Sequence, residues 1–153
     1  MKSLIKSFKY ALEGIIYCWQ TQRNIKIHFI LGAAVIWGSF FFDLSKTEIL
    51  IILLTIVSVL ITEMINTAIE KTVDLFTKDY HPLAKIAKNV AAGSVLVAAV
   101  NSLIVAYLIF AERLYLLFVR GLSNLKEIVI FLLFVAFICF LLVLVVRSSD
   151  VKR

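Results

Sequence analysis

The sequence predicts an all-α integral membrane protein, and three observations support this fold class. Hydrophobic residues make up 62% of the 153 residues, against roughly 45–50% in soluble domains. The mean hydropathy is +1.01. Only one Pro and five Gly interrupt the chain. Long apolar runs with so few helix breakers are typical of transmembrane helices, which satisfy their backbone polar groups internally.

Residues 1–24 are predicted to form an amphipathic helix that lies on the membrane surface. Apolar residues recur at helical spacing between polar ones, beginning with Leu4, Ile5 and Phe8. A secretory signal peptide is the alternative. It is disfavoured because the first wholly apolar run starts only after Lys26 and has no small-residue cleavage site near it.

Three transmembrane helices are predicted next, at residues 25–44, 49–75 and 90–111. Between the first two, Ser45 or Thr47 is expected to cap the second span, with Glu48 in its first turn. A polar turn that contains His81 and Pro82 is expected before the third span.

The C-terminal part, residues 112–153, is predicted to be an addition to a membrane domain formed by residues 1–111. It would consist of a loop, a fourth span at 128–146 and a basic tail. The simplest interpretation of the fourth span is a lipid-facing anchor. Cys18 and Cys139 have no metal-ligand spacing, so neither a zinc site nor a disulfide framework is expected.

The distribution of basic residues predicts the orientation in the membrane. The net charge is +6, but the Lys and Arg residues stand between apolar runs. Topology and anionic headgroups explain them better than nucleic acid, for which no recognition motif is present. Twelve of the 16 fall in the N-terminal segment, in 71–89 and in the tail. These segments are therefore expected in the cytoplasm.

A polar stripe within the second span is the strongest indication of function. Glu63, Asn66, Glu70 and Asp74 are spaced by three, four and four residues, which places them on one helix face. Carboxylates within a membrane helix are costly unless they are paired, protonated or hydrated. The stripe favours a cation site, since Mg²⁺ prefers carboxylates and substrate phosphates. Helix packing through polar contacts and a proton or ion pathway are the alternatives.

Lys85, Lys88 and Asn89 continue this polar character at the start of the third span. A lysine there can extend to the interface along its own aliphatic stem, or it can bind a polyphosphate as a point charge. Neither a P-loop nor a protein-kinase glycine loop is present, so any nucleotide site belongs to another class.

Two motifs in these segments resemble the signature of the bacterial diacylglycerol and undecaprenol kinases, which are small membrane lipid kinases. The first runs from Glu63 to Asp74 and the second from Tyr80 to Gly93. The usage of Pro and Lys is similar to the Gram-positive branch, which often phosphorylates undecaprenol. The resemblance covers about residues 1–111.

The resemblance implies a homotrimer in the bacterial cytoplasmic membrane, with one surface helix and three spans in each subunit and sites shared between neighbours. It implies ATP and Mg²⁺ as co-substrate and cofactor, and a lipid alcohol as acceptor. Glu63 would be the general base, Glu70 would hold the metal and Asn66 would support that cluster. The nucleotide would be surrounded by Tyr10, Asp74, Asp79, Tyr80, His81, Lys88 and Asn89.

The chain departs from the family pattern at two positions. Gln22 stands where the family has a second metal-binding Glu, and Asn89 stands where it has Asp. Each change replaces a carboxylate by an amide, which is a weaker ligand for a hard cation. The alternative function is therefore a family member with weak kinase activity that binds lipid or nucleotide, or acts as a scaffold. A transporter is disfavoured because no pair of broken helices is present.

Overall fold

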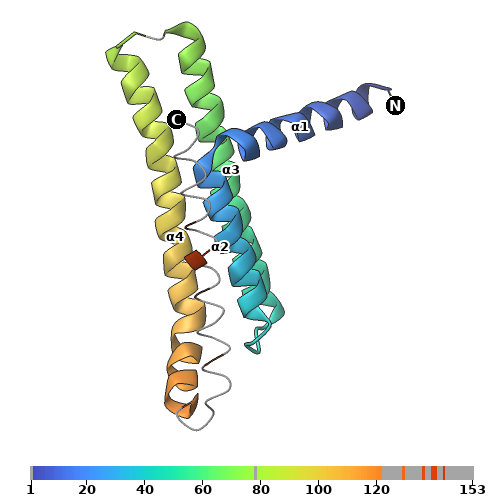
Figure 1. Cartoon of the computed structure of the whole chain (residues 1–153), viewed down its shortest axis with the longest axis vertical. Coiled ribbons are helices and arrows are strands. Elements are labelled where there is room, and N and C mark those ends of the chain that lie inside the picture. Colours follow the sequence, from blue (N-terminus) through green and yellow to red (C-terminus); the bar gives the residue numbers. More distant parts are fainter. Residues whose placement is uncertain are drawn as a thin grey trace.

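The structure, a computed structural model, describes residues 2–77 and 79–121, and only isolated positions beyond them. The described part folds into four helices joined by short connections (Figure 1). They are α1 (Lys2–Thr21), α2 (Arg23–Ser39), α3 (Lys46–Phe76) and α4 (Pro82–Gly121). No strand is found within the described ranges. The all-α prediction is confirmed there, whereas the predicted fourth span lies outside the described residues.

Helix α1 projects sideways from the other three helices (Figure 1). It is amphipathic as predicted, and large apolar side chains such as Leu4, Ile5 and Phe8 are about two thirds exposed, at 64%, 66% and 65%. A single residue, Gln22, separates it from α2 in extended backbone conformation, with φ −102° and ψ 117°. This sharp change of direction is the geometry that a surface helix leading into a span requires.

Helices α3 and α4 form a long antiparallel hairpin that carries most of the tertiary contacts (Figure 1). Within the described part of the chain, the two segments long and apolar enough to cross a membrane are Lys46–Phe76 and Pro82–Leu116. Only 17% and 6% of their most apolar windows are buried inside the chain. Such exposed apolar helices match a lipid surface or further copies of the chain, and not the core of a soluble protein.

Helix α2 is shorter than the predicted span at 25–44. It has 17 residues and ends at Ser39, and turns follow from Phe40 onward. At 1.5 Å per residue it is about 26 Å long, which is slightly less than the hydrocarbon core of about 30 Å. Its place as a span therefore stays a prediction. Gly32 allows it to approach α3 closely, because a Cβ at this position would lie 2.8 Å from Ile56 Cγ2.

Both ends of α3 are formed by residues that the sequence singled out. Ser45 is the N-cap and forms a capping box with Glu48, so the choice between Ser45 and Thr47 falls on Ser45. The turn after α3 leads directly to Pro82 at the first position of α4, where the missing N–H is tolerated. The expected break is confirmed at residues 77 and 79–81, whereas Pro82, predicted to lie in the turn, already belongs to α4.

Helix α4 is longer than the predicted third span at 90–111. It starts eight residues earlier, at Pro82, and continues to Gly121, so the expectation of a loop from residue 112 is wrong for residues 112–121. The reason is a contact distant in sequence. Arg113 Nη2 lies 2.9 Å from Glu48 Oε1, so α4 extends past the polar residues to meet the start of α3.

Candidate functional site

The polar stripe of α3 runs from the interior of the helix bundle to the end of α3 that leads into the turn before α4. Glu63, Asn66 and Thr67 are buried, and Glu63 is the most enclosed large side chain, at 2% exposed. Glu70 and Asp74 are half-buried. The stripe therefore leads from an enclosed carboxylate to a solvent-accessible one along a single helix face.

Hydrogen bonds within α3 orient the side chains of Asn66 and Thr67. Asn66 Nδ2 donates to Glu70 Oε1 at 3.2 Å, and the Thr67 hydroxyl donates to the Glu63 carbonyl at 2.9 Å. Two buried side-chain atoms, Glu63 Oε1 and Asn66 Oδ1, have no hydrogen-bond partner among the described residues. Buried polar atoms are normally satisfied, so unpaired oxygens in this place point to a ligand, a water or a further side chain.

A pocket of about 230 Å³ lies beside the turn that joins α3 to α4. It is lined by Val73, Asp74, Thr77, Asp79, Tyr80, His81, Ala84, Lys85, Lys88 and Asn89. Lys88 Nζ donates to Asp74 Oδ1 across the hairpin, and the two side chains are 40% and 44% exposed. A lysine held at the wall of an open pocket is suited to bind an anionic group.

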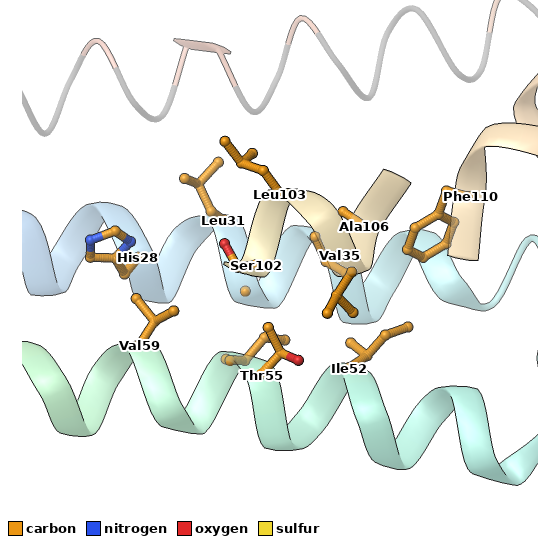
Figure 2. A pocket seen from close by; sticks show the side chains of 13 residues that line it. His28, Leu31, Val35, Ile52, Thr55, Val59, Ser102, Leu103, Ala106 and Phe110 are labelled. Atoms are coloured by element: carbon orange, nitrogen blue, oxygen red, sulfur yellow. The ribbon is translucent and has the colours of Figure 1, made fainter. Parts of the chain in front are cut away.

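A second, apolar cavity of about 190 Å³ lies deeper, between α2, α3 and α4. Figure 2 shows the side chains that line it, among them Leu31 and Val35 from α2 and Ile52 from α3. His28 is one of the few polar groups in its wall. The structure therefore has a polar pocket near one end of the hairpin and an apolar cavity along the middle of the helices.

The structure brings the end of the first motif, Glu63 to Asp74, next to the start of the second motif, Tyr80 to Gly93. Six of the predicted nucleotide residues line the polar pocket: Asp74, Asp79, Tyr80, His81, Lys88 and Asn89. Glu63, Asn66 and Glu70 lie on the same helix below it, but are not among its lining residues. Tyr10 and Gln22, on α1 and at the start of α2, do not line the pocket of their own chain either.

Sequence reasoning missed some residues of these sites. Thr77 and Ala84 line the polar pocket, and a place in the loop and on the next helix turn is the only signal that marked them. Lys85 also lines the pocket, which favours the anion-binding interpretation of this lysine over simple extension to the interface. His28 was missed altogether, although a histidine in an apolar run is itself a signal.

The stripe offers oxygen atoms that can serve as ligands for a magnesium ion. No group of three or more His, Cys, Asp or Glu side chains suitable for a metal occurs among the described residues. Mg²⁺, however, is usually held by one or two carboxylates, water and substrate phosphates. The Glu70 carboxylate and the unpaired Asn66 Oδ1 are oxygen donors of this kind. The residues present therefore fit a magnesium ion that is bound together with a phosphate substrate.

The fold and the pocket define a small helical membrane protein with a lysine-lined polar pocket at one end of its main hairpin. A family model described as prokaryotic diacylglycerol kinase matches residues 9–110. The chain therefore belongs to the prokaryotic diacylglycerol kinase family, a family of membrane lipid kinases, and the resemblance found in the two motifs is confirmed.

Individual relatives agree with this membership. A diacylglycerol kinase of Synechocystis sp. is 45% identical over 104 residues, which are 67% of this chain and 59% of the relative. An undecaprenol kinase of Bacillus subtilis is 45% identical over 114 residues, 74% of this chain and 93% of the relative. A diacylglycerol kinase of Pseudomonas aeruginosa is 29% identical over 98 residues, 64% of this chain and 80% of the relative. The match thus spans less than two thirds of the Synechocystis protein.

Proposed function

We propose that the protein transfers the γ-phosphoryl group of ATP to the hydroxyl of a membrane lipid alcohol, at the cytoplasmic face of a bacterial cell membrane. The observation that carries this proposal is the order of groups along one hairpin. A buried carboxylate, Glu63, is followed by Glu70 and then by the pocket that holds Lys88. Glu63 and Glu70 are separated by about 10 Å of helix rise, so a lipid and a nucleotide can approach from opposite ends of the stripe.

In this mechanism Glu63 is the general base. The lipid hydroxyl gives its proton to the Glu63 carboxylate, the hydroxyl oxygen attacks the γ-phosphorus, and the bond to the β-phosphate oxygen breaks to release ADP. Lys88 neutralises charge on the phosphates, and Asp74 holds Lys88 at the pocket wall. Glu70 and Asn66 would hold Mg²⁺, which supplies neutralisation of phosphate charge when bound.

Undecaprenol is the acceptor that we favour, and diacylglycerol is the alternative. The Bacillus subtilis relative, whose length the match covers to 93%, is named an undecaprenol kinase. The Synechocystis relative, equally identical but covered to 59%, is named a diacylglycerol kinase. Both acceptors carry a primary hydroxyl at the interface, so the common chemistry does not depend on this choice.

A homotrimer with sites shared between subunits accounts for two features. The apolar faces of α3 and α4 are mostly exposed in the single chain. Gln22 and Tyr10 do not line the pocket of their own chain, and in a trimer they are free to complete the site of a neighbour. The excess of basic residues in the segments next to this end of the hairpin supports its cytoplasmic location.

The test is transfer of labelled phosphate by purified protein in lipid bilayers. The protein is supplied with γ-labelled ATP, Mg²⁺ and either undecaprenol or diacylglycerol. We expect labelled lipid phosphate that depends on both Mg²⁺ and the acceptor, with faster transfer to undecaprenol. If neither lipid is labelled while ATP still binds, the protein is a binding or scaffold member of the family, as its amides Gln22 and Asn89 would then explain.

A further inference from the structure

His28 on α2 faces the buried carboxylate of Glu63 on α3. Its Nε2 atom lies 3.8 Å from Glu63 Oε1, and the two side chains are 22% and 3% exposed. Figure 2 shows His28 at one end of the apolar cavity, opposite Phe110 at the other end. The carboxylate therefore meets an imidazole at the point where the apolar interior ends and the polar stripe begins.

The carboxylate oxygen that faces His28 needs a polar neighbour. Glu63 Oε1 has no hydrogen-bond partner among the described residues. Within a membrane helix, an ionised carboxylate that lacks a partner costs several kcal/mol, and it normally pairs with another group. Of the described side chains, His28 is the one with a basic nitrogen close to this carboxylate, at 3.8 Å.

Other charged groups are far less suited to this role. Residues 89–111 of α4 and residues 15–21 of α1 contain no Asp, Glu, Lys, Arg or His, and their titratable groups are Tyr107, Tyr17 and Cys18. On α2, Lys26 Nζ contacts the carbonyl oxygen of Gln20, on the α1 side.

On α3 itself, the nearest acidic residue of the stripe is Glu70, two turns away, and it accepts a hydrogen bond from Asn66. Among the helices packed around Glu63, the histidine of α2 is thus the group that can supply an N–H to its free oxygen.

We infer that His28 is a positioning residue for Glu63, whose carboxylate its Nε2–H orients for proton transfer. The inference rests on the proposed function, in which Glu63 takes the proton of the lipid hydroxyl. The separation of 3.8 Å is longer than a hydrogen bond of about 2.7–3.2 Å. Catalytic hydrogen bonds are often long before substrate binds and shorten in the reactive complex. One carboxylate oxygen is then fixed by the imidazole, and the other remains free to accept the proton.

The kinetic test compares two substitutions in the full-length protein in bilayers. His28→Leu keeps an apolar side chain of similar size in the cavity but removes the donor, and His28→Gln restores an N–H. We expect His28→Leu to lower kcat about tenfold or more, as for loss of a hydrogen bond to a charged group, with an unchanged KM for ATP. His28→Gln should recover most of the lost kcat. Leu31→Ala, which alters the same cavity without a polar group, is the control and should leave kcat nearly unchanged.

A second measurement needs no turnover and separates this inference from the proposed function. Dicyclohexylcarbodiimide reacts with protonated carboxyl groups in membranes, and mass spectrometry locates the label. We expect His28→Leu to increase labelling of Glu63 at neutral pH, and His28→Gln to return it toward the wild-type extent. If the wild-type protein fails to phosphorylate lipid, the proposed function is wrong. The expected change in labelling would still support the contact between His28 and Glu63.

Two results would overturn the role of His28. One is a His28→Leu variant with wild-type kcat and wild-type labelling of Glu63. The other is an equal loss of kcat in the Leu and Gln variants with no change in labelling, because that pattern belongs to a residue required only for packing.

Discussion

Lys88 on α4 pairs with Asp74 on α3 at the wall of the polar pocket, across the turn that joins the two helices. With side chains 40% and 44% exposed, a pair of this kind contributes only about 0–1 kcal/mol to stability. Its main effect is therefore on geometry. It holds a positive charge next to Asn89 and His81 in a pocket that we assign to the phosphates of ATP.

Replacement of Lys88 should weaken ATP binding without unfolding the protein. We expect Lys88→Met to raise the KM for ATP by about tenfold or more, because a charge-assisted contact to phosphate is lost. Asp74→Asn should give a smaller rise, since the lysine is released but kept. Lys71→Met, one turn before Asp74 and exposed outside the pocket, is the matched control. Equal effects of the Lys71 and Lys88 changes on KM would remove Lys88 from the nucleotide site.

Restoration of the two family carboxylates tests the cation site. We expect Gln22→Glu and Asn89→Asp to lower the Mg²⁺ concentration needed for half-maximal activity, because each adds a negative charge to a prospective ligand set. The larger gain should come from Gln22→Glu, at the position that the motif resemblance assigns to a metal-binding Glu. If the wild-type protein is fully active and neither substitution lowers the Mg²⁺ concentration for half-maximal activity, the two amides are compatible with full metal binding.

The close approach of α2 to α3 at Gly32 should be essential for the position of His28. Gly32→Ala places a Cβ 2.8 Å from Ile56 Cγ2, and such overpacking typically costs about 1–3 kcal/mol. We expect a lower Tm in detergent and a reduced kcat. Gly14→Ala, where nothing lies within 4 Å of the added Cβ, should leave the Tm equal or higher. Recovery of the Gly32→Ala loss by Ile56→Ala would locate the strain at this contact, and a Gly32→Ala protein as stable as wild type would contradict it.

The sequence predicted most of what local pattern controls. The uniform apolar runs predicted α3 and α4, and Ser45 with Glu48 marked the start of α3, because capping depends on neighbouring residues only. The end of α2 at Ser39 was missed because Phe40, Phe41 and Phe42 are as apolar as the helix. Hydrophobic pattern alone does not mark a helix end in such a run.

The sequence did not reveal which side chains from distant segments contact each other. The polar residues near Arg113 suggested a loop, but this side chain meets Glu48, 65 residues away, and α4 continues. In the site, the spacing of Glu63 and Glu70 placed them on one face of a helix. Nothing in the sequence indicated that His28 faces Glu63, because that contact depends on how α2 packs against α3.

The most direct test of the central claim compares wild type with Glu63→Gln in the same bilayers, measuring both transfer of labelled γ-phosphate to the lipid and binding of ATP. Gln keeps the size of the side chain and removes the carboxylate that accepts the proton. We predict a kcat lowered by about 10²-fold or more, with ATP binding nearly unchanged. Phosphate transfer by Glu63→Gln at close to the wild-type rate would contradict the assignment of Glu63 as the base.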